Sequence, residues 1–227
     1  MAKILSIIIP VYNEEKTIEK ILEATEKTQL PNFKKEILIV DDGSTDGTRE
    51  ILKKLAAKYQ VLFHKRNRGK GAAIKTALHF VKGDYVIIQD ADLEYDPADW
   101  QKLIETAEQS PKAVIYGSRN LGTAGRGYLP YYLGGRLLTS LVNLLFRTRL
   151  TDINTGYKLF PTEILRTLNL QSNGFEFCEE VTCKILKRGN VIKEVPIGYR
   201  PRTFQEGKKI SFWDGLIGIW TIIKNRF

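Results

Sequence analysis

The segment YVIIQDADLEYDP (residues 85–97) runs from a buried strand into a cluster of acids. Mostly apolar residues are followed by acids at alternate positions, namely Asp90, Asp92 and Glu94. Alternate residues of an extended segment point to the same side, and close carboxylates resist joint ionisation unless a positive charge lies between them. The segment therefore predicts a strand that ends at a binding site for a cation.

These acids admit two interpretations. Asp is frequent at helix N-caps and in turns, so the cluster can be structural. Mg²⁺ or Mn²⁺ prefers oxygen ligands and commonly uses one or two carboxylates together with substrate phosphates. We favour the metal interpretation because the alternation brings the carboxylates to one side.

Two segments nearer the N-terminus repeat this pattern of a buried strand followed by acids. ILSIIIPVY (4–12) ends beside Glu14, and KEILIV (35–40) ends beside Asp41 and Asp42. Amphipathic helical segments separate these apolar strands, which indicates an α/β, Rossmann-like, mostly parallel sheet with helices on both faces. Ligands bind at the carboxyl ends of such strands, so the acid clusters should meet at one edge.

The remaining elements can be placed along the chain. We expect strands at 4–12, 35–40, 61–66, 84–89 and 113–119, and helices at 15–28, 48–59, 72–81 and 97–109. Further along, we expect an amphipathic helix within 128–150, a strand or loop at 152–160, a helix over 174–190, an edge strand at 191–201 and a last helix at 212–227. No linker is visible, so we expect one domain over residues 1–227.

Composition limits the class of protein. The formal net charge of +9 over 227 residues favours anionic partners such as phosphates or acidic lipids. Cys178 and Cys183 show no CxxC spacing, which argues against a disulfide framework or a zinc site and suggests reduced thiols in the cytoplasm. The first residues do not resemble a signal peptide, and no stretch reaches the ~20 apolar residues of a membrane span. We therefore expect a protein that is soluble or lies on a membrane surface.

Taken together, the motifs resemble family 2 glycosyltransferases. IIIPVYNEEKTI, ILIVDDGSTDGT, NRGKGAA and GDYVIIQDADLEYDP occur in the order and spacing of that family. The chain looks most like the branch of dolichyl- and polyprenyl-phosphate sugar synthases, and this likeness continues through DINTGYKLF, GFEF and EVPI. The resemblance implies a GT-A fold with a nucleotide-sugar half (1–120) and an acceptor half (121–227), and an Asp-x-Asp metal motif.

The resemblance also implies roles for particular residues. The expected donor-binding residues are Pro10, Tyr12, Glu14, Val40, Asp42, Asp90, Ala91, Asp92 and Lys208. The metal, Mg²⁺ or Mn²⁺, would be held by Asp90 and Asp92, with Glu94 as a third ligand where the branch often has Gln. The expected catalytic residues are Asp92, Arg119 and Arg202. Guanidinium groups suit phosphate oxygens, and a metal stabilises the charge that develops on a departing diphosphate.

The branch implies transfer of a hexose from a UDP- or GDP-sugar to a polyprenyl phosphate. Such an acceptor is already an anion and needs no strong base, so its phosphate would attack the anomeric carbon with inversion. A sugar hydroxyl acceptor would need a base, for which the candidates are Asp152, Glu179 and Glu180. The sequence does not choose the sugar or the base of the nucleotide.

A lipid acceptor requires an approach to the membrane. The segment 212–227 places Trp213, Leu216, Trp220 and Ile223 mostly on one broad face, as interfacial helices do. The leucine-rich helix between Leu133 and Phe146 is a second possible contact, although packing onto the sheet is an equally good explanation of either segment. We expect peripheral binding to the cytoplasmic membrane face, directly or through a membrane partner protein.

Other classes of protein fit less well. A non-catalytic nucleotide- or nucleic-acid-binding module is disfavoured because RNP-like aromatics, zinc spacing and a helix-turn-helix pattern are missing. A nicotinamide dehydrogenase lacks its GxGxxG after the first strand. NRGKGAA (67–73) is not a GxxxxGK[ST] phosphate loop, so we interpret it as a tight turn and helix start beside the nucleotide site. His64 and His79 are interpreted as structural or surface residues.

Overall fold

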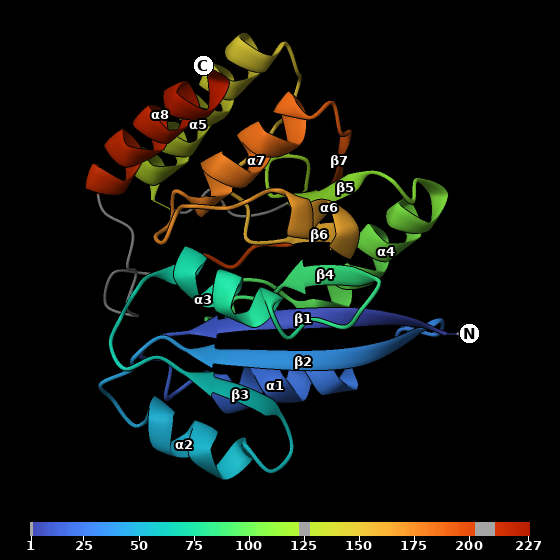
Figure 1. Ribbon diagram of the computed structural model, residues 1–227, viewed down its shortest axis with the longest axis vertical. Coiled ribbons are helices and arrows are strands. Elements are labelled where there is room, and N and C mark those ends of the chain that lie inside the picture. Colours follow the sequence, from blue (N-terminus) through green and yellow to red (C-terminus); the bar gives the residue numbers. More distant parts are fainter. Residues whose placement is uncertain (1, 123–127, 203–211) are drawn as a thin grey trace.

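The computed structural model describes residues 2–122, 128–202 and 212–227, and strands from both halves of the chain form one sheet (Figure 1). In this part of the chain the sheet has seven strands in the order β3-β2-β1-β4-β6-β5-β7. The strand pairs are parallel except those of β6 with β4 and with β5. The α/β, mostly parallel architecture expected from the sequence is confirmed. The single-domain organisation stays a prediction, which the shared sheet supports.

Strands and helices alternate in the N-terminal half. The elements are β1 (Lys3–Val11), α1 (Ile18–Lys27), β2 (Phe33–Asp41), α2 (Thr48–Leu55), β3 (Gln60–Phe63), α3 (Lys70–Leu78), β4 (Tyr85–Ile88), the 3-10 helix η1 (Pro97–Asp99), α4 (Trp100–Gln109) and β5 (Val114–Ser118). The second half contains α5 (Leu129–Phe146), β6 (Lys158–Pro161), α6 (Thr162–Thr167), α7 (Phe177–Lys187), β7 (Ile192–Pro196) and α8 (Phe212–Arg226).

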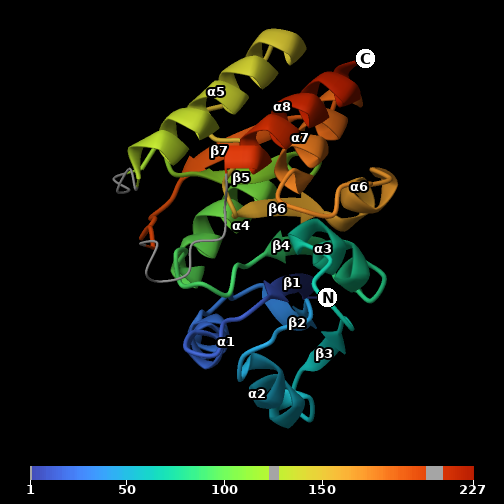
Figure 2. The same cartoon turned by 90° about the vertical axis from the view of Figure 1, so that its left-hand side faces the viewer.

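Helices cover both faces of the sheet, as the continuous apolar strands predict (Figure 2). One core cluster joins the sheet to α1, α2 and α4, and a second joins it to α3, α6 and α7. Within β1, Ile7 and Ile9 belong to the first cluster and Ile8 to the second, because successive side chains of a strand point to opposite faces. The carboxyl ends of β1, β2 and β4 meet at one edge of the molecule, on the left of Figure 1.

Helices α5 and α8 form a further layer that packs on α7 rather than on the sheet (Figures 1 and 2). A small cluster that includes Leu138, Val142, Cys183 and Ile222 holds this layer together. Leu141 and Leu145 of α5 pack against that cluster, whereas Leu133, Leu137 and Leu144 are exposed. The apolar surface of α5 is therefore only partly used in packing.

The structure settles the elements that the sequence left open. Residues 152–157 form a loop and β6 occupies only Lys158–Pro161, so the segment 152–160 is both loop and strand. The six-residue helix α6 was not expected, since it is too short to show helical periodicity. Strand β7 lies at the edge of the sheet, which agrees with the position of Pro196.

Gly43, in the loop after β2, meets two requirements that only glycine satisfies together. Its φ of 74° lies in the left-handed region. A Cβ at this position would also lie 2.4 Å from the carbonyl carbon of Arg66, which is main chain and cannot rotate away. Gly189, just after α7, has the same φ of 74° but no atom within 4 Å of the added Cβ. A comparison of substitutions at the two glycines therefore separates the cost of the left-handed backbone conformation from the cost of the close approach of Arg66 to Gly43.

We expect Gly189→Ala to lower the free energy of unfolding by about 1 kcal/mol, the ordinary cost of a left-handed alanine. Gly43→Ala should cost a further ~1–3 kcal/mol, because the 66–67 segment must move. Urea unfolding followed by circular dichroism measures both variants. Equal losses for the two would show that the approach of Arg66 to Gly43 does not constrain the fold.

Candidate active site

The loops after β1 and β2 are tied together at the carboxyl edge of the sheet. The Asn13 amide donates to Ser44 Oγ over 3.0 Å, and the Thr45 amide donates to Asn13 Oδ1 over 2.8 Å. The Gly47 amide donates to Glu15 Oε2 over 3.0 Å. Asn13 adopts a φ of 51°, a left-handed conformation in which Asn is enriched. These bonds join the two loops into one rim next to β4.

Asp42 is buried and holds the segment that leads into α3. Its Oδ1 lies 2.6 Å from His64 Nδ1 and accepts a hydrogen bond from the Arg68 amide, while Oδ2 accepts one from the Gly69 amide. His64 Nε2 lies 2.9 Å from Thr76 Oγ1, so the histidine links this loop to α3. Asp42 and His64 thus have a positioning role, and contact of Asp42 with a base or ribose stays a proposal.

Asp90 faces a lysine from α3. Lys70 Nζ lies 2.5 Å from Asp90 Oδ1, and both side chains are mostly buried. Burial is the largest single influence and lowers the pKa of Lys70, but the negative charges of Asp90, Cys178 and Asp92 together outweigh it, so the pKa of Lys70 lies above its ordinary value. The other oxygen, Oδ2, faces Gly156, where an added Cβ would lie only 2.4 Å from it. The added Cβ would also lie 2.8 Å from Cε2 of the buried Tyr95 ring, so glycine at 156 lets the 152–157 loop lie against Asp90 and Tyr95.

Asp92 carries a carboxyl group that resists ionisation. Burial, reinforced by the charges of Asp90 and Glu94, raises the pKa of Asp92 to about 7. The Glu94 amide donates to Asp92 Oδ1 over 3.0 Å, and Arg202 supplies a nearby positive charge, so both partly offset the rise. A cation placed between these carboxylates would relieve the remaining repulsion.

Glu94 binds the segment 199–202, which follows β7. Its Oε2 accepts a hydrogen bond from the Tyr199 hydroxyl over 3.0 Å, and its Oε1 accepts one from the Arg202 amide over 2.8 Å. The Arg200 amide donates to the Glu94 carbonyl over 2.9 Å. Within the described residues, no three His, Cys, Asp or Glu side chains are grouped as a metal site. Both Glu94 oxygens accept hydrogen bonds from the 199–202 segment, and Glu94 as a third metal ligand stays a prediction.

Arg202 bridges the loops after β1 and β4. Its Nη2 lies 2.6 Å from Glu14 Oε2, and its Nε donates to the Asp92 carbonyl over 2.7 Å. Burial opposes the charge of Arg202, but the bond to Glu14 and the charge of Asp92 raise its pKa above the ordinary value. A permanent positive charge therefore lies beside the acids of β1 and β4.

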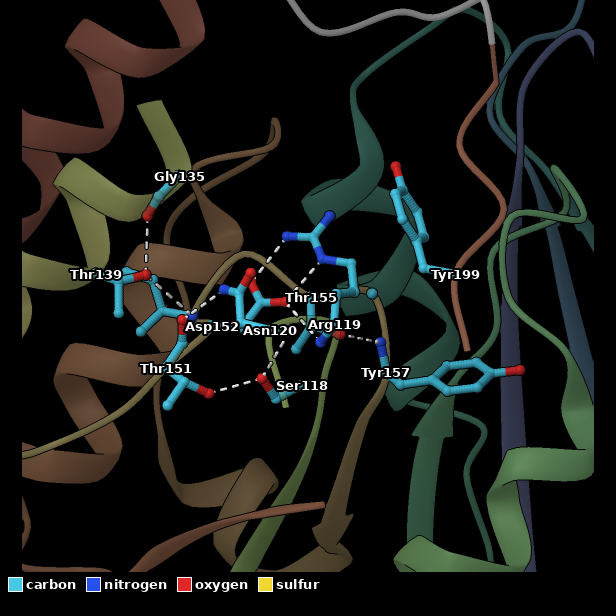
Figure 3. A network of polar contacts seen from close by, with 12 residues as sticks. Ser118, Arg119, Asn120, Gly135, Thr139, Thr151, Asp152, Thr155, Tyr157 and Tyr199 are labelled. Atoms are coloured by element: carbon cyan, nitrogen blue, oxygen red, sulfur yellow. Dashed lines mark hydrogen bonds and ion pairs between the residues drawn. The ribbon is translucent and has the colours of Figure 1, made fainter. Parts of the chain in front are cut away.

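Arg119, after β5, is held in place by the loop before β6 (Figure 3). Its Nε and Nη2 donate to the two carboxylate oxygens of Asp152 over 2.7 and 2.8 Å. The guanidinium also lies over the ring of Tyr199, 5.1 Å from its centroid. Asp152 is fixed in turn, because its amide donates to Glu194 Oε1. This bidentate pair orients Arg119, which is one quarter exposed.

The residues at the end of β4 fit a divalent cation of the magnesium type. Asp90 and Asp92 supply oxygen ligands, and burial, reinforced by the charges of Asp90 and Glu94, raises the pKa of Asp92. Mg²⁺ and Mn²⁺ commonly take one or two carboxylates and complete their shell with water and substrate phosphates. Two aspartates therefore suffice when a diphosphate supplies the other oxygens.

The remaining predicted donor-binding residues fall into three groups. The side chains of Val40 and Ala91 are buried in the core, so only their main-chain atoms can contact a ligand. Pro10 and Tyr12 are half-buried at the end of β1, beside the rim described above. Lys208 lies outside the described residues, and its role stays a prediction.

Sequence reasoning missed three members of the site, namely Lys70, Gly156 and Tyr199. Lys70 was set aside because NRGKGAA does not match a phosphate loop, yet a lysine between two glycines at a helix start was a usable signal. Gly156 and Tyr199 are brought to the site by contacts 61 or more residues apart in the chain, with Tyr95 and Glu94 respectively. Nothing in their local sequence marks them.

The three candidate bases are all engaged. Asp152 binds Arg119 through both oxygens. Glu180 accepts hydrogen bonds from the amides of Gln171 and Ser172 and pairs with Lys184. Glu179 is buried against α8 and accepts a hydrogen bond from Asn154 Nδ2.

The sequence is also similar to proteins of known family. The model of glycosyl transferase family 2 matches residues 6–168. The low-salt glycan biosynthesis hexosyltransferase Agl6 of Haloferax volcanii is 31% identical over 222 residues, which cover 95% of this chain and 52% of Agl6. Glycosyltransferase AglJ of the same organism is 28% identical over 200 residues, covering 86% of this chain and 63% of AglJ. The chain thus spans about half the length of Agl6 and less than two thirds of AglJ.

Solved structures share the fold. Glucosyl-3-phosphoglycerate synthase from Mycobacterium tuberculosis, in complex with Mn²⁺, UDP and phosphoglyceric acid, superposes with a TM-score of 0.76 at 19% identity, over 99% of this chain and 78% of that one. Its complex with Mg²⁺ and UDP gives a TM-score of 0.74 at 20% identity, over 98% and 79% of the two chains. At this identity the likeness establishes the GT-A fold.

Glu179 should make stability depend on pH. Burial raises its pKa to about 7, above its ordinary value of 4.5, so the folded protein binds more protons than the unfolded chain between these values. The stability that this difference contributes is present below pH 4.5 and is lost as pH rises through about 7. We expect Glu179→Gln, which cannot ionise, to be more stable than wild type by ~1–3 kcal/mol at pH 8 and nearly equal at pH 5.

Urea unfolding at pH 5, 6, 7 and 8 measures this difference. Glu163→Gln, at the exposed start of α6, is the control and should follow wild type at every pH. A constant difference between Glu179→Gln and wild type across this range would contradict the burial of an uncharged Glu179.

Proposed function

Because the chain belongs to glycosyl transferase family 2, we propose that it transfers a hexose from a UDP- or GDP-sugar to a polyprenyl phosphate, with inversion and with Mg²⁺ or Mn²⁺. Glycosyl transfer as such follows from the family and from the Agl relatives. The nucleotide, the metal, the lipid acceptor and the place of the reaction are parts of the proposal. The hexose is suggested by Agl6, a hexosyltransferase.

The observation that carries the choice of acceptor is the engagement of all three candidate bases. A sugar hydroxyl must lose a proton as it attacks, which calls for a base within hydrogen-bond reach. Asp152 is paired with Arg119, Glu180 with Lys184, and Glu179 is buried under α8. A phosphate acceptor is already ionised at neutral pH and needs none of them. Its oxygen forms the new bond to the anomeric carbon as the bond to the nucleoside diphosphate breaks.

The donor would lie at the carboxyl ends of β1, β2 and β4. A divalent cation at Asp90 and Asp92 would stabilise the negative charge that develops on the departing diphosphate. Arg202 supports this arrangement from the other side, because it holds the Glu14 and Asp92 loops at a fixed separation and adds a permanent positive charge. Pro10, Tyr12 and Glu14 would line the nucleoside pocket, beside the rim formed by the first two loops.

The acceptor phosphate would be bound by Arg119. Asp152 takes Nε and Nη2 of its guanidinium, and Tyr199 covers one face, so the group is held rigidly next to the segment that carries Arg202. A preoriented guanidinium loses little conformational entropy on binding a phosphate. Lys208 would add a mobile charge, in keeping with the family resemblance.

The lipid tail would enter the membrane beside α5 and α8. These helices lie side by side at one end of the molecule (Figure 1), and they expose Leu137, Leu144, Trp213 and Trp220. Lys224 and Arg226 follow at the end of α8, where anionic headgroups would attract them. No helix in the described part of the chain has the length and apolarity of a transmembrane span. Peripheral binding at the cytoplasmic membrane face, alone or with a membrane partner, is the mode that we propose.

The proposed reaction can be tested with purified protein, a panel of UDP- and GDP-hexoses, Mg²⁺ or Mn²⁺ and a short polyprenyl phosphate, with products identified by mass. We expect a hexosyl polyprenyl phosphate, and a loss of at least ~100-fold in rate for Asp92→Ala, since charge stabilisation at a leaving group is worth several kcal/mol. Asp96→Ala removes only the N-cap of η1 and should keep the rate within about twofold. Transfer to a sugar hydroxyl, and not to the lipid phosphate, would overturn the acceptor proposal.

Membrane binding predicts flotation with anionic liposomes at low salt. Replacing Leu137 and Trp220 together by Ser should reduce the floating fraction at least fivefold, since two large apolar side chains leave the interface. Phe80→Ser is the matched control, because Phe80 is also exposed but lies after α3, away from α5 and α8. Wild-type protein that stays at the bottom of the gradient would contradict direct binding.

A further inference from the structure

Lys70 and Asp90 form a buried ion pair that the proposed function does not explain. Lys70 Nζ lies 2.5 Å from Asp90 Oδ1, and the exposed fractions of the two side chains are 17% and 16%. Removing a lysine and a carboxylate from water is costly, and close pairing offsets part of this cost, so either group would be poorly placed without the other. Yet Asp90 is one of the two residues that we propose as metal ligands.

The main chain around Lys70 is fixed, which aims the lysine at Asp90. Gly69 has a φ of 96°, and an added Cβ there would lie 2.3 Å from the carbonyl oxygen of Asn173. An added Cβ at Gly71 would lie 2.6 Å from the carbonyl oxygen of Ser172. Glycine on both sides of Lys70 therefore lets the start of α3 press against the 172–174 segment.

The helix start itself is not open to a phosphate. The Gly71 amide donates to the Gly174 carbonyl over 3.2 Å, and the Ala72 amide donates to the Asn173 carbonyl over 3.0 Å. These N–H groups would otherwise bind an anion, as helix N-termini often do. Since these two N–H groups are engaged, we expect a diphosphate at this helix start to meet the ammonium of Lys70.

Lysine and a divalent cation are in conflict at Asp90. Both seek the same carboxylate oxygens, and two positive centres within a few ångströms repel each other strongly in a poorly solvated site. A donor diphosphate resolves the conflict, because it offers Lys70 a new anionic partner and offers the cation further oxygen ligands. Lys70 can then exchange Asp90 for the diphosphate, which leaves the carboxylate of Asp90 available to the metal ion.

We propose that Lys70 competes with the divalent cation for Asp90 and moves to the donor diphosphate, so that metal and nucleotide bind cooperatively. This inference rests on the proposed function for the identity of the nucleotide, but not for the competition at Asp90. Under this proposal the ammonium of Lys70 balances the charge of Asp90 when no metal ion is bound. It also makes metal affinity low until a nucleotide arrives.

The test measures Mn²⁺ binding directly, by the electron paramagnetic resonance signal of free Mn²⁺, with and without UDP or GDP. Wild type should bind Mn²⁺ weakly alone and at least tenfold more tightly with one of the nucleotides. Lys70→Met should bind Mn²⁺ alone about tenfold more tightly than wild type, and the enhancement by the nucleotide should fall by a similar factor, which is an ordinary coupling between two ligands. Lys70→Arg keeps the charge and should retain weak Mn²⁺ binding.

Lys75→Met is the matched control. Lys75 lies on the same helix, but its ammonium binds the Gln171 carbonyl and Asn173 Oδ1 instead of a metal ligand, so its Mn²⁺ affinity should equal that of wild type. Thermal unfolding checks that each variant is folded, and Lys70→Gln replaces Lys70→Met if the latter is not. Unchanged or weaker Mn²⁺ binding in the neutral variant would overturn the competition. Failure of both nucleotides to bind wild type would instead contradict the proposed function, while Mn²⁺ binding alone would still decide the role of Lys70.

Discussion

The carboxylates of Asp90, Asp92 and Glu94 follow one another at the end of β4, and Glu14 stands near them at the end of β1. Burial, reinforced by the charges of Asp90 and Glu94, raises the pKa of Asp92. Lys70 and Arg202 balance these charges within the protein. The segments around the end of β4 are arranged so that the side chains of Lys70 and Arg202 lie next to these acids.

These contacts between positive and negative side chains join segments that are far apart in the chain. Arg202 reaches Glu14 across 188 positions, and in doing so it joins the loops after β1 and β4. Antiparallel β6 lies between β4 and β5, which brings the preceding loop, with Gly156, against Asp90 and, with Asp152, against Arg119. One loop, residues 152–157, thus contacts both the side that we propose for the donor and the side that we propose for the acceptor.

The layer of α5 and α8 leaves more of its apolar side chains exposed than the core of the sheet does. Its small cluster buries Leu138, Val142 and Ile222 but leaves a broad apolar surface exposed, including Leu144 and Trp220. A surface of this kind on a soluble monomer usually marks an interaction site. This surface lies within residues 121–227, the part of the chain that we propose to bind the acceptor.

The sequence by itself determined the α/β fold, the parallel strands of the N-terminal half and the position of Asp90 and Asp92, because periodicity and strand-end acids are local signals. Only the tertiary structure decided which charges meet. In the folded chain Glu94 accepts hydrogen bonds from Tyr199 and Arg202, Asp152 pairs with Arg119, and Lys70 pairs with Asp90. Such pairs are set by distances between segments that are remote in the chain, and local sequence carries no record of those distances. The sequence thus identifies the acidic residues of the site, whereas the tertiary structure determines which side chains pair with them.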